Sequence, residues 1–321
     1  MSNSAANSQV LSAQTHNTEP PVVSFGLPVY NAERYLSRLF DSLLAQDLQA
    51  IEVVVSDNGS TDRTEDICEE YVRRGLCVRY HRNQENLGQI ANFNRVLELA
   101  RGKYFRWIGA DDWLEPEYAS RCVEALEAQR SFVGVTTYQD HIHDDGKRDY
   151  SEYRGERLDS PSPHVRFQRM GWFMTAGHYT LDPIYTMMRR DMLLATHRLQ
   201  ILPNTDQVLA MELSLFGPWT HVPACLAHRR REPIREINWE EVHKRYHPTR
   251  YQELHDPHIR MATSLFSVLR SAPISLGDKL RCIGPVLRFT WVRVYRRTYW
   301  TLRGMPGRVR RALRSLWQPS H

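Results

Sequence analysis

Residues 51–64 read IEVVVSDNGSTDRT, a β-branched run that stops at a cluster of turn-forming residues. Isoleucine and valine are enriched in strands, whereas Asp, Asn, Gly and Ser favour turns. We therefore expect residues 51–55 to form a strand and Asp57 to lie in the turn after it. Asp62 is placed to cap the next helix, which we expect at about residues 62–74.

Strand and helix patterns alternate on both sides of this segment. Further elements are expected as strands at residues 22–27, 76–81 and 104–108, and as helices at residues 36–44 and 88–100. Such alternation indicates a parallel sheet covered by helices. The expected first helix is not preceded by a GxGxxG motif, which argues against a dinucleotide-binding fold. This order places Asp57 and Asp111 at the carboxyl ends of two strands, the edge at which open α/β sheets bind ligands.

The second half of the chain is less regular. We expect strands at residues 132–138, 184–188 and 219–222, a long polar loop at 140–163 and a helix at 208–216. Residues 238–271 are expected to be helical, with interruptions at Pro248 and Pro257. His141, His143, Asp144 and Asp145 fall in the loop, where we interpret them as solvated. Arginines interrupt the apolar stretches near the end too often for a transmembrane helix.

Charge is distributed unevenly along the 321 residues. Residues 279–321 contain eleven Lys and Arg and no Asp or Glu, whereas the rest holds 31 basic and 37 acidic residues. A mildly acidic body argues against nucleic-acid binding. Five cysteines without a CxxC pair favour reduced thiols and a cytoplasmic protein, and residues 1–20 are expected to be a disordered leader.

The basic tail is amphipathic if it is helical. Leu287, Trp291 and Val294 then fall on one face, and arginines such as Arg288 and Arg293 fall on the other. A basic helix with Trp and Leu on its apolar face suits an anionic membrane surface, which predicts a peripheral protein at the inner face of the cell membrane. The alternatives are a helix packed on the body and, less favoured, an RNA-binding segment.

Four segments, with a weaker fifth, together resemble the inverting glycosyltransferases of family 2. They are VSFGLPVYNAERYL (23–36), VVVSDNGSTDRT (53–64), NLGQIANFNRVLELARGKYF (86–105), WIGADDWLEPE (107–117) and the weaker TDQVLAMELSLFG (205–217). Their order and spacing match the family over residues 22–232. The resemblance implies an α/β fold of the GT-A type, with a Rossmann-like, mostly parallel sheet flanked by helices and here a basic helical C-terminal extension.

The resemblance implies a nucleotide-sugar donor, with a UDP-sugar favoured. Donor-binding residues are expected at Pro28, Tyr30, Asn31, Asp57, Asn94 and Asp111. A carboxylate at position 57 suits the imide N–H of a pyrimidine base, although Asp57 could equally be a helix cap or an Asx-turn residue.

Asp111 and Asp112 are the expected metal ligands, for Mn²⁺ or Mg²⁺. A divalent ion held there would neutralise the diphosphate leaving group. The family motif usually has an acid two positions before the principal ligand, and Gly109 replaces it here.

Asp206 matches the family's acidic residue before the acceptor-side helix, and we expect it to be the catalytic base. The alternative is that Asp206 caps that helix, in which case Glu212 is the reserve candidate. His228 and Arg229 could contact the diphosphate, His228 could also ligate the metal, or both could belong to a surface basic cluster.

These features predict a glycosyltransferase domain at residues 21–236, a helical extension at 237–278 and a membrane-associating tail at 279–321. Within the domain, residues 21–130 form the nucleotide-sugar half and 131–236 the acceptor half. The expected acceptor is a membrane-associated glycan or a lipid-linked glycan. The alternative is a catalytically weakened, sugar-nucleotide-binding partner in a polysaccharide assembly complex, and a nucleotidyltransferase is less favoured.

Overall fold

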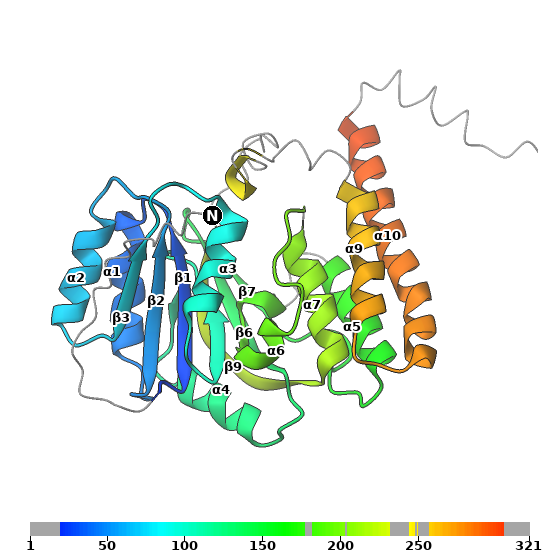
Figure 1. Cartoon of the computed structure of the whole chain (residues 1–321), viewed down its shortest axis with the longest axis horizontal. Helices are drawn as coiled ribbons and strands as arrows, with labels where there is room; N and C mark the ends of the chain where they lie inside the picture. Colours follow the sequence, from blue (N-terminus) through cyan, green and yellow to red (C-terminus); the bar gives the residue numbers. More distant parts are fainter. Residues whose placement is uncertain are drawn as a thin grey trace, which may run out of the picture.

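The computed structural model describes residues 20–176, 182–202, 204–231, 244–247, 249 and 257–304. Nearly all of the expected leader and residues 305–321 of the tail therefore lie outside the described residues. The described chain builds an α/β body around one sheet, with strand order β3-β2-β1-β4-β8-β6-β9-β5 and with β7 paired to β6 (Figure 1).

The first half follows the expected alternation closely. Its elements are β1 (Val23–Val29), α1 (Glu33–Leu44), β2 (Ile51–Asp57), α2 (Thr64–Arg73), β3 (Val78–Arg82), α3 (Gln89–Leu99) and β4 (Tyr104–Trp107). All seven residues of β2 are buried, because parallel neighbours flank it and helices cover it. In the register of β1 and β2, Val29 lies beside Asp57, so the two loops that follow start at the same level.

The second half is richer in strands than expected. It contains β5 (Trp113–Leu114), α4 (Tyr118–Glu127), β6 (Gly134–His143), β7 (Arg148–Ser151), α5 (Pro163–Thr175), η1 (Pro183–Tyr185), β8 (Met187–Arg189), α6 (Arg190–Leu194), α7 (Thr205–Phe216) and β9 (Trp219–Arg231). The expected loop at 140–163 is wrong at its start, because β6 continues to His143 and turns back through Gly146 into β7. Pairing with β9 along its whole length sustains this polar strand, a partner that local composition does not reveal.

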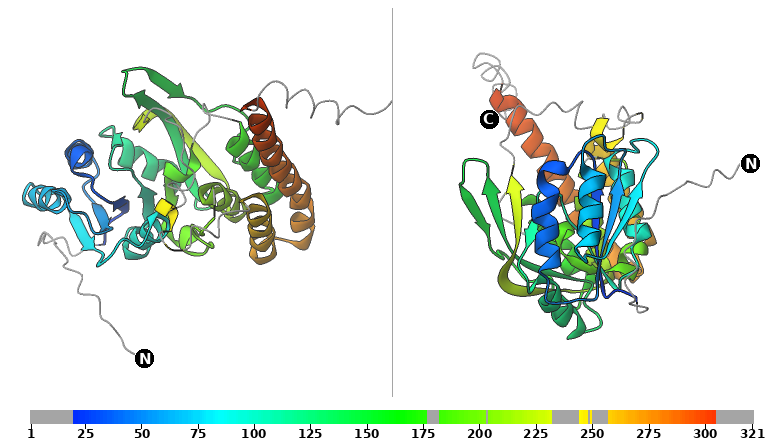
Figure 2. Two further views of the ribbon diagram at one scale, coloured as in Figure 1. Left: turned by 90° about the horizontal axis from the view of Figure 1, so that it is seen from above. Right: turned by 90° about the vertical axis from the view of Figure 1, so that its left-hand side faces the viewer.

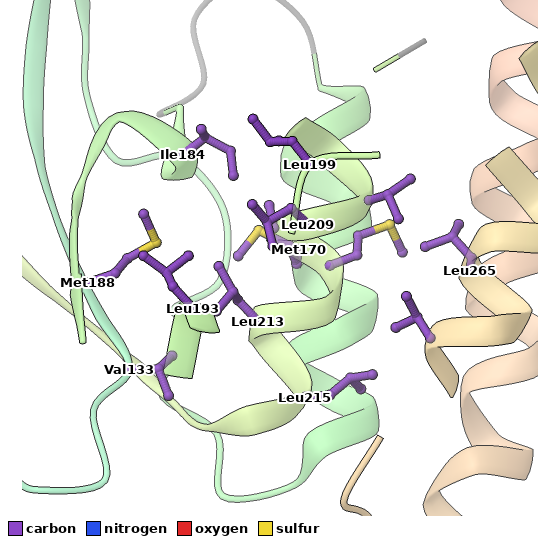
Figure 3. Close-up of a cluster of buried hydrophobic side chains, with 14 of the residues drawn as sticks. Val133, Met170, Ile184, Met188, Leu193, Leu199, Leu209, Leu213, Leu215 and Leu265 are labelled. Carbon is purple, nitrogen blue, oxygen red and sulfur yellow. The ribbon is translucent and has the colours of Figure 1, made fainter. Parts of the chain in front are cut away.

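Two apolar clusters cover the two faces of the sheet. One joins α1, α2 and α4 to the sheet, and the other joins α3, α5, α7, α9 and α10. Figure 3 shows part of the second cluster, in which Met170, Leu209 and Leu265 lie close together although they come from three different helices. The C-terminal helices thus share a core with the body.

The C-terminal helices are α9 (Pro257–Ser271) and α10 (Leu276–Gly304), and they lie at the end of the molecule opposite α1 and α2 (Figure 2). Cys282, Val286 and Phe289 of α10 are buried in the second cluster, and the Arg293 guanidinium donates a hydrogen bond to the Met174 carbonyl at 3.0 Å. The expected boundary between the helical extension and the tail, at residues 278 and 279, therefore falls inside α10. The first part of the tail packs on the body, as the alternative interpretation held.

The opposite face of α10 carries a row of apolar side chains toward solvent. Leu280, Ile283, Leu287, Trp291 and Val294 recur at spacings of three and four residues, and Trp291 is 64% exposed. We call these five residues the outer stripe. No helix among the described residues is long and apolar enough to span a membrane.

Candidate functional site

Asp57 ends β2 and is completely buried. Its Oδ1 accepts hydrogen bonds from the Ser60 N–H at 2.8 Å and from the Ser60 hydroxyl at 2.6 Å. Its Oδ2 accepts one from the Tyr80 hydroxyl at 2.5 Å and lies 3.6 Å from the Arg82 guanidinium. These contacts make Asp57 the residue that organises the turn after β2, and contact between Asp57 and a base stays a prediction.

The loop between β1 and α1 is fastened to the turn after β2. The Asn31 N–H donates to the Ser60 hydroxyl at 2.8 Å, and the Asn31 side-chain oxygen accepts from the Thr61 N–H at 2.9 Å. Asn31 has φ 51°, in the left-handed region that asparagine tolerates. Pro28 lies in β1 just before this loop, and Tyr30 is 54% exposed, so its ring is accessible for stacking on a base.

Three asparagines join the strand ends beneath this loop. The Asn83 amide donates to the side-chain oxygens of Asn58 and Asn92 at 3.0 and 3.2 Å. The Asn92 amide donates in turn to the Ser56 carbonyl at 2.9 Å. Asn92 was not among the expected site residues. Its partners lie on other elements, so helical spacing gave no sign of the network.

Asn94 connects α3 to the chain before α7. Its amide donates to the Leu199 carbonyl at 2.8 Å, and its oxygen accepts from the Leu199 N–H at 3.1 Å. Asn94 therefore positions the loop that leads to Asp206. Direct donor contact by Asn94 stays a prediction.

The two adjacent acids after β4 have different surroundings. Asp112 is 2% exposed, accepts a hydrogen bond from the Gly109 N–H at 3.1 Å and lies 3.6 Å from the Arg229 Nε. Burial raises the pKa of Asp112. Asp111 is more open and lines a cavity of about 370 Å³. Asp111 is thus the acid that faces the cavity, and a metal on Asp112 would have to compete with Arg229.

Gly109 leaves space for both carboxylates. A Cβ added there would lie 2.9 Å from the Asp111 Oδ1 and 3.2 Å from the Asp112 Oδ2. No cluster of three or more His, Cys, Asp or Glu within the described ranges could hold a metal alone. One or two carboxylates nevertheless fit Mg²⁺, which usually takes its other ligands from substrate phosphates and water.

Asp206 lies in the first turn of α7, where it is partly exposed. The N-cap position belongs to Asn204, so the idea that Asp206 is the cap is wrong. Burial, and secondarily the charge of Asp182, raises the pKa of Asp206 to about 6. A carboxylate with a pKa near neutrality is suited to general base catalysis.

Arg229 connects the two acidic regions. Its guanidinium lies 3.0 Å from the Asp182 carboxylate and 3.6 Å from that of Asp112, and it stacks 3.9 Å from the centre of the Tyr185 ring. Asp182 in turn acts electrostatically on Asp206. Asp182 was not among the expected site residues, because an acid in an irregular stretch matches no motif or spacing.

The reserve base, Glu212, is engaged elsewhere. It is buried, and its Oε1 lies 2.6 Å from the His197 Nδ1. The His197 N–H donates to both of its oxygens, at 3.2 and 3.1 Å. Glu212 therefore holds a turn in place.

His228 is held by contacts with neighbouring side chains of the protein. Its Nε2 is 2.7 Å from a Glu115 oxygen, and its ring stacks on that of Trp113 with centroids 5.1 Å apart. The acids and histidines of the β6–β7 hairpin are also paired: His143 contacts Asp149 at 2.8 Å, and Asp144 binds Arg230 at 2.5 Å. The interpretation of these loop residues as solvated is wrong for His141, which is buried, whereas Asp144 and Asp145 are exposed as expected.

Comparison with known proteins agrees with this geometry. The family model Glycosyl transferase family 2 matches residues 24–194. The chondroitin synthase of Escherichia coli is 32% identical over 165 residues, which cover 49% of this chain and 24% of that protein. Glycosyltransferase GlyA of Streptococcus pneumoniae is 32% identical over 120 residues, covering 37% and 17%. The chain spans less than half the length of these curated relatives.

A solved structure with a similar fold is that of S. aureus TarS 1-349 in complex with UDP-GlcNAc. Its TM-score is 0.61 at 19% identity, and the alignment covers 83% of this chain and 72% of that one. The likeness shows a shared GT-A fold. Since the family model matches more than half of the chain, the protein belongs to glycosyl transferase family 2.

Proposed function

We propose that the protein is an inverting glycosyltransferase that moves a sugar from a nucleotide-sugar donor to an acceptor hydroxyl. The observation that carries this proposal is a chain of charged residues between two acids, Asp111 and Asp206. Asp111 faces a cavity, and Asp206, with a raised pKa, is linked to it through Asp112, Arg229 and Asp182. Asp111 would hold the metal ion that neutralises the leaving diphosphate, and Asp206 would accept the proton of the attacking hydroxyl.

The residues present suggest how the reaction proceeds. With a pKa of about 6, Asp206 is ionised at neutral pH and can accept the proton of the acceptor hydroxyl as that oxygen attacks. Arg229 keeps Asp182 in place by an ion pair, and Asp182 makes Asp206 more basic. Mn²⁺ or Mg²⁺ held by Asp111, with Asp112 beside it, would neutralise charge on the leaving diphosphate.

A UDP-sugar is the favoured donor. The support is the exposed Tyr30 ring beside the turn that Asp57 organises, where the family resemblance puts the base. TarS has been solved with UDP-GlcNAc, but at 19% identity that likeness concerns the fold, so the donor class rests on this chain's own residues.

The acceptor is proposed to be a glycan or lipid-linked glycan at the inner face of the cell membrane. The outer stripe of α10 supports this, because Lys279, Arg281 and Arg288 lie on the same helix as its exposed apolar side chains. Apolar side chains with flanking basic residues suit the interface of an anionic bilayer. Chondroitin synthase among the relatives points to glycan synthesis as the reaction class.

Nucleotide release tests the proposal against the alternative of a catalytically weakened binding partner. Purified protein is incubated with UDP-sugars, with and without Mn²⁺, and released UDP is measured. A transferase should release UDP with metal and faster with acceptor. Donor binding without release under any of these conditions would favour the binding partner.

Membrane docking gives a separate prediction. The full chain should sediment with vesicles of phosphatidylcholine and phosphatidylglycerol but not with phosphatidylcholine alone, and less at high salt, since part of the attraction is screened. The double substitution L287S/W291S should weaken binding about tenfold or more, because each buried apolar side chain contributes about 1.5–3 kcal/mol.

The matched control is I259S/F266S, which removes two exposed apolar side chains from α9. Point variants are used here because a truncation within the tail would remove α10 residues that belong to the core. Equal sedimentation of L287S/W291S and the wild type would contradict docking through the outer stripe.

A further inference from the structure

A second cavity, of about 380 Å³, lies between the loop after β7, α5 and α10. It belongs to the end of the molecule opposite α1 and α2 (Figure 2). Its volume falls in the range of about 300–1,000 Å³ in which proteins bind small molecules. None of the residues expected for the donor site, all of which the structure describes, lines this cavity. The cavity is therefore separate from the expected donor site.

An exposed tryptophan forms part of the cavity wall. Trp172 of α5 is 43% exposed, and its ring meets that of Phe173 in a T-shaped arrangement with centroids 5.2 Å apart. Gly155 lies against the same ring: its φ is 93°, and a Cβ there would lie 2.4 Å from a carbon of the Trp172 ring. Glycine thus lets the indole pack directly on the loop after β7. A fixed aromatic ring offers a large apolar contact area, on which the C–H face of a sugar ring can stack.

The cavity also offers hydrogen-bonding groups of several kinds. Its polar lining residues are Glu156, Gln168, Arg169, Thr175 and Arg288. Arg169 is fixed by an ion pair with Glu156, whereas no carboxylate of the described residues lies within ion-pair distance of Arg288. Amide, carboxylate and guanidinium groups can each bind neighbouring hydroxyl groups through more than one hydrogen bond. Such a lining suits a ligand with many hydroxyl groups better than an apolar one.

The cavity and the outer stripe lie on different faces of α10. Pro285, Arg288 and Val292 line the cavity, and their spacing of three and four residues puts them on one face of the helix. Leu287 and Trp291 of the outer stripe belong to another face, since successive helical residues are turned by about 100°. A bilayer that covers the outer stripe would therefore lie to one side of the cavity. This arrangement favours a glycan over an acyl chain as the ligand.

The cavity extends toward Asp206. It follows α5 from Gln168 to Thr175, a distance of about 10 Å at the helical rise per residue. The carbonyl of Met174, next to Thr175, accepts a hydrogen bond from the Arg293 guanidinium at 3.0 Å. Burial raises the pKa of Asp206 and the charge of Arg293 opposes that rise, so Arg293 lies within electrostatic range of Asp206. A chain bound along α5 would thus extend toward the proposed base.

We propose that the cavity between α5 and α10 binds a carbohydrate chain, with Trp172 stacking on a sugar ring and Arg288 donating hydrogen bonds to its hydroxyl groups. This inference rests on the proposed function in one respect: the chain would be the part of the glycan acceptor that does not react. Binding of this part would hold the reacting hydroxyl near Asp206 and so favour its attack. The site would also contribute to the choice of acceptor.

Glycan binding is measured without a donor, so it does not depend on sugar transfer. The full chain is applied to an array of neutral and acidic oligosaccharides, and calorimetry gives its affinity for the glycan that it binds most tightly. Trp172→Ala should weaken that binding about tenfold or more, because the sugar ring would lose its stacking surface. Arg288→Gln is a second variant, at an exposed position outside the core, and should also bind more weakly.

Two matched controls remove the same kinds of side chain outside the cavity. Trp291→Ala removes an exposed tryptophan of the outer stripe, and Arg270→Gln removes an exposed arginine of α9. Both should bind the glycan like the wild type. Trp291→Ala should instead weaken sedimentation with anionic vesicles, whereas Trp172→Ala should leave that sedimentation unchanged.

Transfer kinetics separate this proposal from the proposed function. If both hold, Trp172→Ala should raise KM for a long acceptor and leave kcat and KM for a monosaccharide acceptor unchanged. Glycan binding that Trp172→Ala loses, with no transfer by the wild type, would support the site and contradict the transferase. Absence of glycan binding by the wild type, or equal affinities of the wild type, Trp172→Ala and Arg288→Gln, would overturn the site. Weaker vesicle sedimentation of Trp172→Ala with unchanged glycan binding would also overturn it and would assign the cavity to the membrane surface.

Discussion

Replacing Asp111 with asparagine is expected to lower turnover about 10³-fold, because a bound metal contributes several kcal/mol to charge stabilisation and 1.36 kcal/mol is one decade in rate. Asp111 lines a cavity, whereas Asp112 is paired with Arg229. The variant should also lose the gain in nucleotide affinity that Mn²⁺ gives the wild type. Turnover is followed by UDP release, and nucleotide affinity by calorimetry.

The control is Asp66→Asn, which removes an exposed carboxylate of α2 that pairs with Arg63 and is not among the residues of the site. It should keep wild-type rates. Full activity of the purified wild type in excess EDTA would contradict a role for the metal, whatever the variants do.

Replacing Asp206 with asparagine is expected to lower turnover by about 10²-fold or more, the usual scale of general base catalysis, while donor affinity stays the same. Only the ionised carboxylate can accept the proton. With a pKa of about 6, the wild-type rate should rise with pH through that value and level off above it. The variant's residual rate should lack this step.

Thermal stability separates catalysis from structure at Asp206. The folded protein raises the pKa of Asp206, so the ionised form is destabilising and the penalty is present at pH 7 and above. Asp206→Asn should therefore melt at the same or a higher temperature at pH 8, and the difference should vanish near pH 4. Loss of stability with recovery of rate at lower temperature would make Asp206 structural.

For Glu212→Gln we expect the opposite result, an effect on stability and none on the pH dependence of the rate. Glu212 accepts hydrogen bonds from the His197 N–H and contacts its ring. This variant should lose stability yet keep the pH dependence that Asp206 gives.

The first half of the fold could be predicted because its signals are local. The run at residues 51–55 became a fully buried β2, and helical spacing from Leu36 placed α1. The second half depends on distant partners. Strand β6 runs through the polar residues up to His143 only because β9 pairs with it, and β9 itself continues nine residues beyond the expected Val222.

The site divides in the same way. Motif position pointed to Asp111, which lines a cavity, and to Asp206, which has a raised pKa, and their roles stay predictions. The turn-forming composition anticipated the turn after Asp57. The ion pairs of Arg229 and the placement of Asp182 arise from elements more than 40 residues apart, which spacing cannot show. In the tail, the helical spacing of apolar residues predicted a helix. That spacing did not show that α10 has two apolar faces, or which of them packs on the body.

Proton NMR of the reaction product tests the central claim most directly. An α-linked UDP-sugar, with GDP-, CDP- and dTDP-sugars in parallel, is incubated with the full chain, Mg²⁺ and a glycan acceptor, and the anomeric coupling of the transferred sugar is read. We predict consumption of one donor and a β-linked product, with the Asp206→Asn variant nearly inactive. Retention of the α configuration, or no consumption of any of these donors, would contradict an inverting transferase that uses Asp206 as its base.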